Sequence, residues 1–284
     1  MFKIVTKRVL NPTVTQMEIL APLVAEKAKP GQFVILRVDQ NGERFPLTVA
    51  GTDPKEGTVK IIFQVVGSTT ALLNHKEVGD SIADFVGPLG NPTRTEGIKR
   101  VCIVGGGVGC AIAMPVAQAF SKLGAHVTSI IGFRTKDLVI LEEEFRDCSD
   151  NMILMTDDGS YGRHGNVTVP LKEMLEAGET FDEVITIGPL VMMKFVVAAA
   201  KPFGVPVIVS MNPIMIDGTG MCGGCRLTLV QGDKRVMKFA CVDGPEFNGY
   251  EIDFDEAMTR GRMYGEFERH AYEETCNLLK GGKS

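Results

Sequence analysis

The sequence lacks several features that define common protein classes. Its 284 residues carry a formal net charge of −5, and no long run of Lys or Arg is present. This balance argues against a nucleic-acid-binding surface and is compatible with a cytoplasmic enzyme. No internal repeat is recognisable, and we expect no secretory leader at Met1.

A disulfide framework and a hydrolase centre are also missing. The seven cysteines are odd in number and show no secreted-type spacing, so a reducing cytoplasm is the expected location. The histidines form no Ser–His–Asp or Cys–His pattern, and no catalytic side chain is predicted. We expect all four to be surface or packing residues: His75, His126, His164 and His270.

One uncharged stretch could be mistaken for a membrane span. Residues 101–120 carry no charge, but they contain four glycines and Pro115. Glycines clustered after a short apolar run predict a strand, a tight loop and a helix. We therefore predict no membrane segment.

The chain is long enough for two domains and a small appendage. Short Val-, Ile- and Phe-rich strands separated by turn residues predict an antiparallel β-barrel over residues 1–97. Over residues 98–214, apolar strands alternate with helical stretches, which predicts an α/β domain with a doubly wound parallel sheet. Residues 215–284 are expected to form a cysteine-bearing loop, a hairpin turning at Gly232-Asp233 and a helical tail.

Three of the seven cysteines lie on one glycine-rich loop. Taking Asp217 as a ligand, its pattern is D-x4-C-x2-C-x15-C, through Cys222, Cys225 and Cys241. The first half matches the C-x4-C-x2-C of plant-type [2Fe-2S] proteins, with Asp for the leading Cys. The glycines allow the backbone to fold tightly around inorganic atoms.

Other interpretations of this loop stay open. It could be a structural zinc site, or the cysteines could be buried small residues without a metal. No His lies at ligand spacing, which favours iron and sulfide over zinc. Asp217 precedes a glycine, so it could also be an ordinary turn residue.

Two segments of the predicted barrel suit a phosphate-bearing cofactor. Arg44-Phe-Pro46-Leu47-Thr48 places a cation on a strand, where it could bind a pyrophosphate by paired hydrogen bonds. Gly67-Ser68-Thr69-Thr70 opens a probable helix, whose N-terminus offers amide donors. Arg44 could equally be a solvated strand residue, and Ser68 with Thr69 an ordinary helix cap.

The second domain begins with a dinucleotide-type loop, Gly105-Gly106-Gly107-Val108-Gly109. It departs from G-x-G-x-x-G, because the third glycine of the pattern falls on Cys110. No acidic residue ends the next strand, where Arg134 could instead favour NADP. A tight turn without a ligand is the alternative.

Two further candidates follow later strands of the predicted sheet. Asp158 lies in the loop after the third strand, and Gly188 ends the next one, at the edge where ligands bind. Plain turn chemistry could explain both.

Together these motifs resemble the ferredoxin reductase-like electron-transfer subunits. The resemblance runs from Pro30-Gly31-Gln32-Phe33 through Gly87-Pro88-Leu89-Gly90 to Cys241. More narrowly, the chain is similar to the small subunits of electron-bifurcating NADH-dependent ferredoxin:NADP oxidoreductases. Those small subunits are also described as subunits of a sulfide dehydrogenase. It is also similar to the dihydroorotate dehydrogenase electron-transfer subunits. The latter have Cys where this chain has Asp217, so the aspartate favours the bifurcating branch.

The resemblance implies FAD in the barrel, NAD(H) in the second domain and a [2Fe-2S] cluster on the C-terminal loop. The resemblance implies NAD(H) rather than the NADP that Arg134 alone could favour. It further implies electron transfer to a larger flavin and iron–sulfur partner subunit, and through the complex to ferredoxin. The implied contacts are Arg44, Pro46, Leu47, Thr48, Gly67, Ser68, Thr69 and Thr70 for FAD, Gly105, Gly106, Gly107 and Gly109 for NAD(H), and Asp217, Cys222, Cys225 and Cys241 for the cluster.

Two rival functions remain at this point. One is the electron-transfer subunit of dihydroorotate dehydrogenase. The other belongs to a different class, a zinc-stabilised nucleotide-binding module without redox activity.

Overall fold

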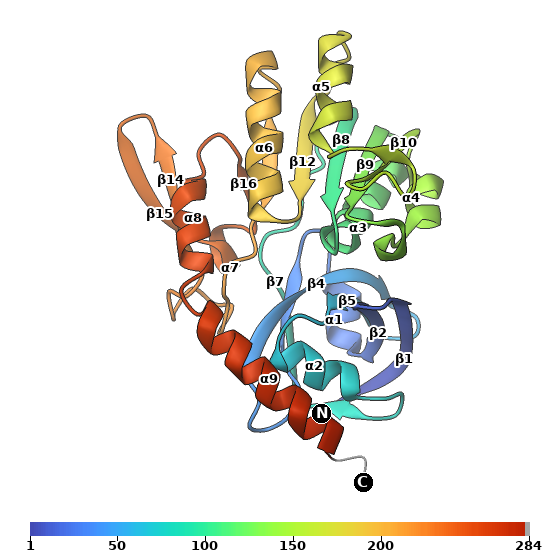
Figure 1. The fold of residues 1–284 in the computed structure, drawn as a ribbon, viewed down its shortest axis with the longest axis vertical. Helices are drawn as coiled ribbons and strands as arrows, with labels where there is room; N and C mark the ends of the chain where they lie inside the picture. Colours follow the sequence, from blue (N-terminus) through green and yellow to red (C-terminus); the bar gives the residue numbers. More distant parts are fainter. Residues whose placement is uncertain (282–284) are drawn as a thin grey trace.

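The computed structural model describes the backbone of residues 1–281 and the side chains of residues 1–278. A barrel and an α/β unit are stacked along the long axis, and the C-terminal segment runs beside both (Figure 1). The barrel has seven antiparallel strands in the order β6-β1-β2-β5-β4-β3-β7. The strands are β1 Phe2–Asn11, β2 Val14–Leu20, β3 Phe33–Arg37, β4 Arg44–Asp53, β5 Thr58–Gln64, β6 Ser81–Ile82 and β7 Asp84–Leu89, with helices α1 Pro22–Lys27 and α2 Ser68–His75.

Alternate side chains along a barrel strand point to opposite faces, so the barrel contributes residues both to its own core and to a second core outside it. On β3, Val34 and Leu36 point into the barrel and are fully buried among its own apolar residues. The intervening Phe33 and Ile35 point outward and join the core of the rest of the molecule. The predicted antiparallel barrel is confirmed. Its outer face at β3 packs against the rest of the molecule.

The second sheet has the order β11-β10-β9-β8-β12-β13-β16. Its strands are β8 Arg100–Gly106, β9 His126–Phe133, β10 Asn151–Thr156, β11 Arg163–His164, β12 Glu183–Ile187, β13 Val207–Ser210 and β16 Glu246–Asn248. All pairs are parallel except β13 with β16. The predicted parallel sheet is confirmed. At this edge the chain returns from the C-terminal segment and adds the three-residue strand β16 in the opposite direction.

Helices cover both faces of this sheet, as predicted. Val101 and Ile103 of β8 face α3 Gly109–Lys122 and α4 Glu142–Cys148. Cys102 and Val104 face α5 Thr168–Glu176 and α6 Leu190–Ala200. Short 3-10 turns, Lys136–Leu138 and Lys201–Phe203, complete the connections. Burial on both faces explains why the strands are continuous apolar runs.

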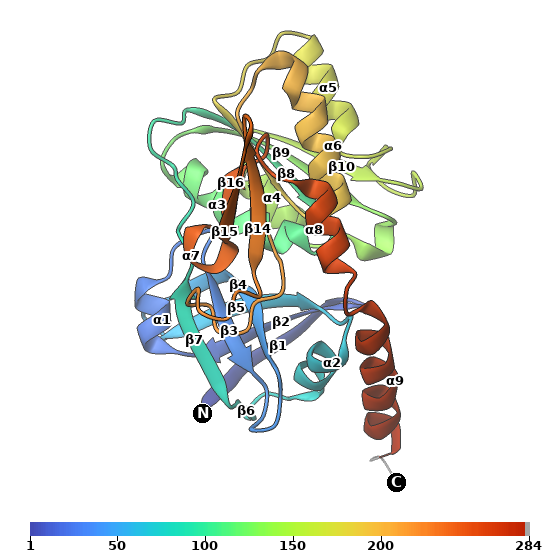
Figure 2. The same cartoon turned by 90° about the vertical axis from the view of Figure 1, so that its left-hand side faces the viewer.

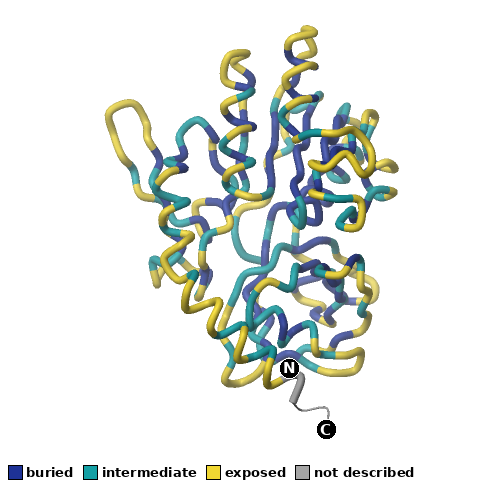
Figure 3. Tube along the Cα trace, in the orientation of Figure 1, coloured by how far each residue is buried: buried dark blue, intermediate teal, exposed yellow. Residues whose placement is uncertain are grey.

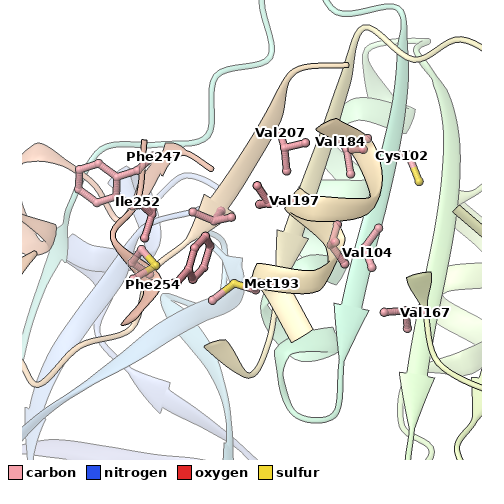
Figure 4. Packing of buried hydrophobic residues seen from close by; sticks show 14 of the residues in the cluster. Cys102, Val104, Val167, Val184, Met193, Val197, Val207, Phe247, Ile252 and Phe254 are labelled. Atoms are coloured by element: carbon pink, nitrogen blue, oxygen red, sulfur yellow. The ribbon is translucent and has the colours of Figure 1, made fainter. Parts of the chain in front are cut away.

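The C-terminal segment shares the core of the α/β unit. Its elements are the hairpin β14 Arg226–Gln231 and β15 Lys234–Phe239, then α7 Ala240–Asp243, α8 Phe254–Gly261 and α9 Gly265–Gly281. Met193 and Val197 of α6 lie between the sheet and Phe254 (Figure 4). The predicted hairpin and helical tail are confirmed. The hairpin tip extends from the body, and α9 lies beside α2 of the barrel (Figures 1 and 2). Both are largely exposed in the part that the structure describes (Figure 3).

The predicted division into residues 1–97, 98–214 and 215–284 stays a prediction, and its last three residues lie outside the described residues. The uncharged stretch 101–120 forms β8, a glycine loop and most of α3. Within residues 1–281, no helix combines the length and apolarity needed to cross a bilayer.

Two partly buried carboxyl groups, those of Glu183 and Glu246, lie where the barrel linker meets the α/β unit. Thr93 Oγ1 donates to Glu246 Oε1 at 2.6 Å. Burial raises the pKa of Glu246 to about 7. Burial, and then the charge of Glu246, also raise the pKa of Glu183 to about 7, against the opposing effect of Arg94. Both groups favour their neutral forms in the folded protein.

We expect these groups to make the protein less stable at alkaline pH. An acid whose folded-state pKa is raised contributes stability below its unfolded pKa of about 4.3, and that stability is lost as the pH rises through about 7. The unfolding free energy should fall by roughly 1–3 kcal/mol between pH 5 and pH 8. Glu246→Gln should flatten this profile in denaturant titrations, whereas the exposed Glu26→Gln should not. A slope unchanged by Glu246→Gln would contradict the assignment.

Candidate functional site

A cavity of about 1090 Å³ lies between the barrel and the carboxyl ends of the parallel strands. The barrel contributes β4 and β5, and the α/β unit contributes the loops that follow β8, β9, β10, β12 and β13. Ligands bind at this edge of open α/β sheets. The volume exceeds that of an ordinary small-molecule pocket.

The barrel wall contains part of the predicted flavin site. Pro46, Leu47 and Thr48 of β4 line the cavity, together with Phe45. Arg44 does not line it. Its Nη2 lies 3.3 Å from Asp84 Oδ2.

Asp84 also pairs with Arg37, whose Nε lies 2.8 Å away. The Arg37 guanidinium holds the pKa of Asp84 below its usual value, with a smaller contribution from Arg44. Asp84 is therefore an ionised partner of both guanidinium groups. Sequence reasoning could not find it, because 40 residues separate Asp84 from Arg44.

The N-terminus of α2 holds the second predicted flavin segment. Thr70 lines the cavity, and its Oγ1 accepts hydrogen bonds from the N–H groups of Gly67 at 3.0 Å and Val66 at 3.1 Å. Gly67, Ser68 and Thr69 lie outside the cavity lining. The Thr70 hydroxyl fixes the direction of the helix N-terminus, which is the end of a helix that attracts anions.

The glycine loop after β8 forms the middle of the cavity. Gly106, Gly107 and Gly109 line it, whereas Gly105 lies beneath, packed against Cys110. A Cβ on Gly109 would lie 2.5 Å from the carbonyl oxygen of Ile187. Gly109 thus provides the close helix–strand approach that the third glycine of a dinucleotide fingerprint provides. Counting from Gly105 assigned that role to Cys110, one residue too far along the chain.

The ends of β9, β10 and β12 complete the nucleotide side. Gly188 lines the cavity, and so do Arg134 and Asp157. Asp158 does not line it, because its carboxylate accepts hydrogen bonds from Ser160 N at 3.0 Å and Ser160 Oγ at 2.6 Å. These bonds lower the pKa of Asp158. Other lining residues that the sequence did not single out are Asn11, Asn166, Thr168, Met192, Phe195, Asn212 and Met215.

The predicted cluster ligands form two pairs on the C-terminal loop. Cys225 Sγ and Cys241 Sγ lie 3.2 Å apart, and both residues are buried. The Asp217 carboxylate accepts hydrogen bonds from Thr219 N at 2.9 Å and Cys222 N at 2.8 Å. These bonds lower the pKa of Asp217. Cys222 is exposed.

This arrangement fits a binuclear cluster better than a single ion. Among the side chains of residues 1–278, no three Cys, His, Asp or Glu residues form a ready site for one metal ion. A [2Fe-2S] cluster distributes its four protein ligands over two irons. Burial and the neighbouring Cys225 raise the pKa of the Cys241 thiol to about 12, so this thiol needs a cationic metal to become a thiolate.

Glycines shape the backbone around these donors. Gly218, Gly220 and Gly223 have φ of 75°, 83° and 67°, in the left-handed region. A Cβ on Gly218 would lie 2.6 Å from Leu89 Cδ1 of the barrel. The loop is therefore packed directly on the outer face of the barrel, and its residues fit the predicted cluster.

Comparison with known proteins agrees with this geometry. Residues 212–253 match the family model described as the iron–sulfur cluster binding domain of dihydroorotate dehydrogenase B. The chain is 48% identical over 271 residues to a Thermotoga maritima protein named as a homolog of the electron transfer subunit of dihydroorotate dehydrogenase B (NAD(+)), covering 95% of this chain and 94% of the relative. It is 34% identical to the corresponding subunit of Geobacillus thermodenitrificans, covering 88% and 96%.

Solved structures give the same result. A chain in the structure of NADH-dependent reduced ferredoxin-NADP oxidoreductase, described for flavin-based electron bifurcation, superposes with a TM-score of 0.89 at 46% identity, covering 96% of this chain and 97% of that one. The cytochrome b5 reductase domain of Ulva prolifera nitrate reductase shares the fold at 16% identity and a TM-score of 0.58, covering 72% and 92%.

The fold and the cysteine loop define a flavin- and iron–sulfur-dependent oxidoreductase subunit that transfers electrons. The chain belongs to the ferredoxin reductase-like family of dihydroorotate dehydrogenase B-type electron-transfer subunits. The predicted cofactors, FAD, NAD(H) and a [2Fe-2S] cluster, are confirmed at the level of this family. The individual contact residues stay predictions.

Proposed function

We propose that this chain is the small subunit of an electron-bifurcating NADH-dependent ferredoxin:NADP oxidoreductase. The observation that supports this best is the similarity over nearly the whole chain, at 46% identity, to a chain of such an enzyme. The bound groups would supply the redox chemistry, in which nicotinamide moves electron pairs and iron–sulfur centres take single electrons. The chain's own residues would bind and orient these groups.

The shape of the cavity supports these roles for the bound groups and for the residues that hold them. Phe45 to Thr48 on the barrel side and the Gly106 to Gly109 loop on the nucleotide side line one continuous space. Two cofactors held on these walls would meet without an intervening layer of protein. Met215 lines the same cavity and belongs to the apolar core that contains Cys225 and Cys241. This core would exclude water between the flavin side and the cluster loop.

The exposed side of the cluster loop suits a partner subunit. Met221 is 87% exposed, Ile216 50% and Val242 44%, and each is adjacent in sequence to one of the predicted ligands Cys222, Asp217 and Cys241. Apolar side chains gathered on a surface indicate a protein contact. We place the larger flavin and iron–sulfur subunit here, with ferredoxin reached through that subunit.

Counting cofactors in the native complex tests the proposal. Anaerobic purification should yield this chain with a larger subunit, one flavin and two irons with two sulfides on the small subunit. The complex should turn over NADH continuously only when its partner half can accept electrons. Zinc without acid-labile sulfide or flavin would reject electron transfer. A partner that oxidises dihydroorotate would instead support the second candidate, which the names of several relatives favour.

A single substitution tests Asp217 as a cluster ligand. We expect Asp217→Cys to retain the cluster and to shift its visible and EPR spectra and its reduction potential, because a thiolate would replace a carboxylate on iron. Asp233→Cys, at the hairpin turn, adds the same thiol away from the loop and should change neither. An intact cluster with unchanged spectra in Asp217→Cys would mean that the aspartate only shapes the turn.

A further inference from the structure

The barrel and the α/β unit meet along a narrow apolar strip. Val14, Ala50 and Ile62 of the barrel strands belong to the core cluster that contains α3. Val14 and Ile62 line the cavity of the candidate site, and Ala50 lines a second cavity of about 940 Å³ between the barrel, α3 and the linker. Apolar contact has no preferred direction, so this strip alone does not fix how the two units are oriented.

A hydrogen bond crosses this contact. Asn11, buried at the end of β1, donates from Nδ2 to the backbone carbonyl of Leu138 at 3.1 Å. No other hydrogen bond or ion pair joins residues 1–89 to residues 100–210, all of which the structure describes. Asn11 Oδ1 accepts from Thr13 N at 2.9 Å and from Thr13 Oγ1 at 3.2 Å. These partners fix the orientation of the amide, because the oxygen must face an N–H and the NH2 group a carbonyl.

Leu138 connects this bond to the loops on the nucleotide side. It ends the 3-10 turn that follows β9, and it lines the cavity. In the same turn, Lys136 N donates to Ser160 Oγ at 2.8 Å, which joins the turn to the loop after β10. On the barrel side, Thr13 lines the cavity and leads into β2. Asn11 therefore connects the two walls of the candidate site directly.

The other connections between the two units lie on the opposite side of the molecule. The chain leaves the barrel through a linker, where Asn91 N donates to Gly244 O at 2.7 Å and Thr93 donates to Glu246. Glu246 belongs to β16 at one edge of the second sheet, whereas β9 lies on the other side of β8. Helices α7 and α8 lie on the left of Figure 1, and strands β1 and β2 lie on the right. Units held only at the linker could rotate about it, and Asn11 holds the side that would open.

We infer that Asn11 is a positioning residue for hydride transfer, because its hydrogen bond to Leu138 holds the flavin wall and the nucleotide wall at the separation that the reaction needs. This inference rests on the proposed function, which requires nicotinamide and flavin to meet in the cavity. The reaction moves a hydride with its two electrons from NADH to FAD, giving NAD+ and FADH−. Its rate depends steeply on the distance between the reacting atoms, and a misplacement near 1 Å can cost about 100-fold.

Substitution by aspartate separates this link from the local turn. In Asn11→Asp the carboxylate can still accept from Thr13, but it has no hydrogen to donate and faces the Leu138 carbonyl with a negative charge. Asn11→Ala removes both the link and the bonds to Thr13. The matched control is Asn74→Asp in α2, because Asn74 Oδ1 accepts from Thr15 Oγ1 at 2.7 Å inside the barrel and aspartate keeps that acceptor.

Stopped-flow reduction of the anaerobic holoprotein by NADH separates binding from hydride transfer. The maximal rate of FAD reduction should fall about twofold to tenfold in Asn11→Ala, the usual cost of one lost hydrogen bond, and at least about tenfold in Asn11→Asp. The dissociation constant for NAD+ and the flavin content should stay within about twofold of the wild type, because neither site loses a contact. The charge-transfer absorbance between nicotinamide and flavin should weaken in the same order as the rate.

Two further measurements are specific to the link. A protonated carboxyl group can donate a hydrogen bond, so the rate defect of Asn11→Asp should shrink as the pH falls from about 8 to about 5.5, whereas that of Asn11→Ala should persist. Hydrogen–deuterium exchange of the holoprotein without nicotinamide should quicken at least about twofold over residues 135–141 in both variants. Asn74→Asp should match the wild type in every measurement.

The possible failures reject different claims. Full-speed flavin reduction in both Asn11 variants would overturn the inference and leave the proposed function intact. Weaker NAD+ binding or lost flavin at an unchanged reduction rate would also overturn it, because Asn11 would then be a cofactor contact. A defect of Asn11→Asp that is equal at low and high pH would show that the bond to Leu138 is not its cause. A wild-type holoprotein whose flavin NADH does not reduce would overturn the proposed function as well.

Discussion

Replacing Cys225 with Ser is expected to remove the iron–sulfur cluster while flavin reduction by NADH continues. Cys225 and Cys241 form the buried half of the predicted ligand set, with their sulfurs 3.2 Å apart. Loss of a residue that merely supports a metal ligand costs 10- to 100-fold in affinity or activity, so loss of a ligand should exceed about 100-fold. The flavin and nucleotide walls lie on other elements and should remain assembled.

Measuring cluster content and flavin reduction separately distinguishes loss of the cluster from loss of the flavin and nucleotide sites. Iron and sulfide per chain should fall close to zero in Cys225→Ser, while the flavin content and the rapid bleaching of FAD by NADH persist. Electron delivery to the partner subunit should fall by more than about 100-fold. Cys276→Ser, outside the predicted ligand set, should match the wild type. Full iron content in Cys225→Ser would rule out this residue as a ligand.

Replacing Gly109 with Val is expected to have the second large effect. Its Cβ would lie 2.5 Å from Ile187 O and 2.7 Å from Gly188 Cα, and these are backbone atoms that cannot rotate away. Overpacking of this kind typically costs roughly 1–3 kcal/mol of stability. The start of α3 would have to move away from β12, which displaces the glycine loop and Gly188 together.

Displacement of this loop should affect the nucleotide far more than the flavin. A misplacement near 1 Å can cost about 100-fold, so we expect FAD reduction by NADH to slow at least that much. Thermal unfolding should begin at a lower temperature, and the flavin content should stay near that of the wild type. Gly51→Ala, where a Cβ meets Lys60 only at 3.8 Å, is the control. Normal NADH reactivity in Gly109→Val would show that the close approach is not required.

Local patterns predicted most elements of the fold. The helix over Leu190–Ala200 and the hairpin turning at Gly232-Asp233 follow from apolar periodicity and turn residues, which are properties of neighbouring positions. The three-residue strand β16 has no such pattern. Its strand geometry comes from pairing with β13, about 40 residues earlier in the chain.

In the candidate site, too, the sequence predicted only the features that neighbouring residues encode. Glycine and cysteine motifs located the nucleotide loop and the cluster loop, because backbone freedom and thiol chemistry are encoded locally. The choice between Asp157 and Asp158 depends on which carboxylate Ser160 binds, and the sequence offers two adjacent, identical residues. The withdrawal of Arg44 from the cavity depends on Asp84, a contact across two strands. Side-chain pairing of this kind needs three-dimensional information.

The outward-facing residues of β3 limit how far the cluster segment could be transplanted. Ile35 and Leu89 of the barrel lie against Gly218, and Phe33 shares the core that contains Cys225. A reductase of the same fold could accept this segment only if its own barrel carried matching apolar residues on the outside. The cluster segment therefore cannot be exchanged between reductases on its own. An engineered iron–sulfur electron-transfer segment would have to be designed together with the barrel face that supports it.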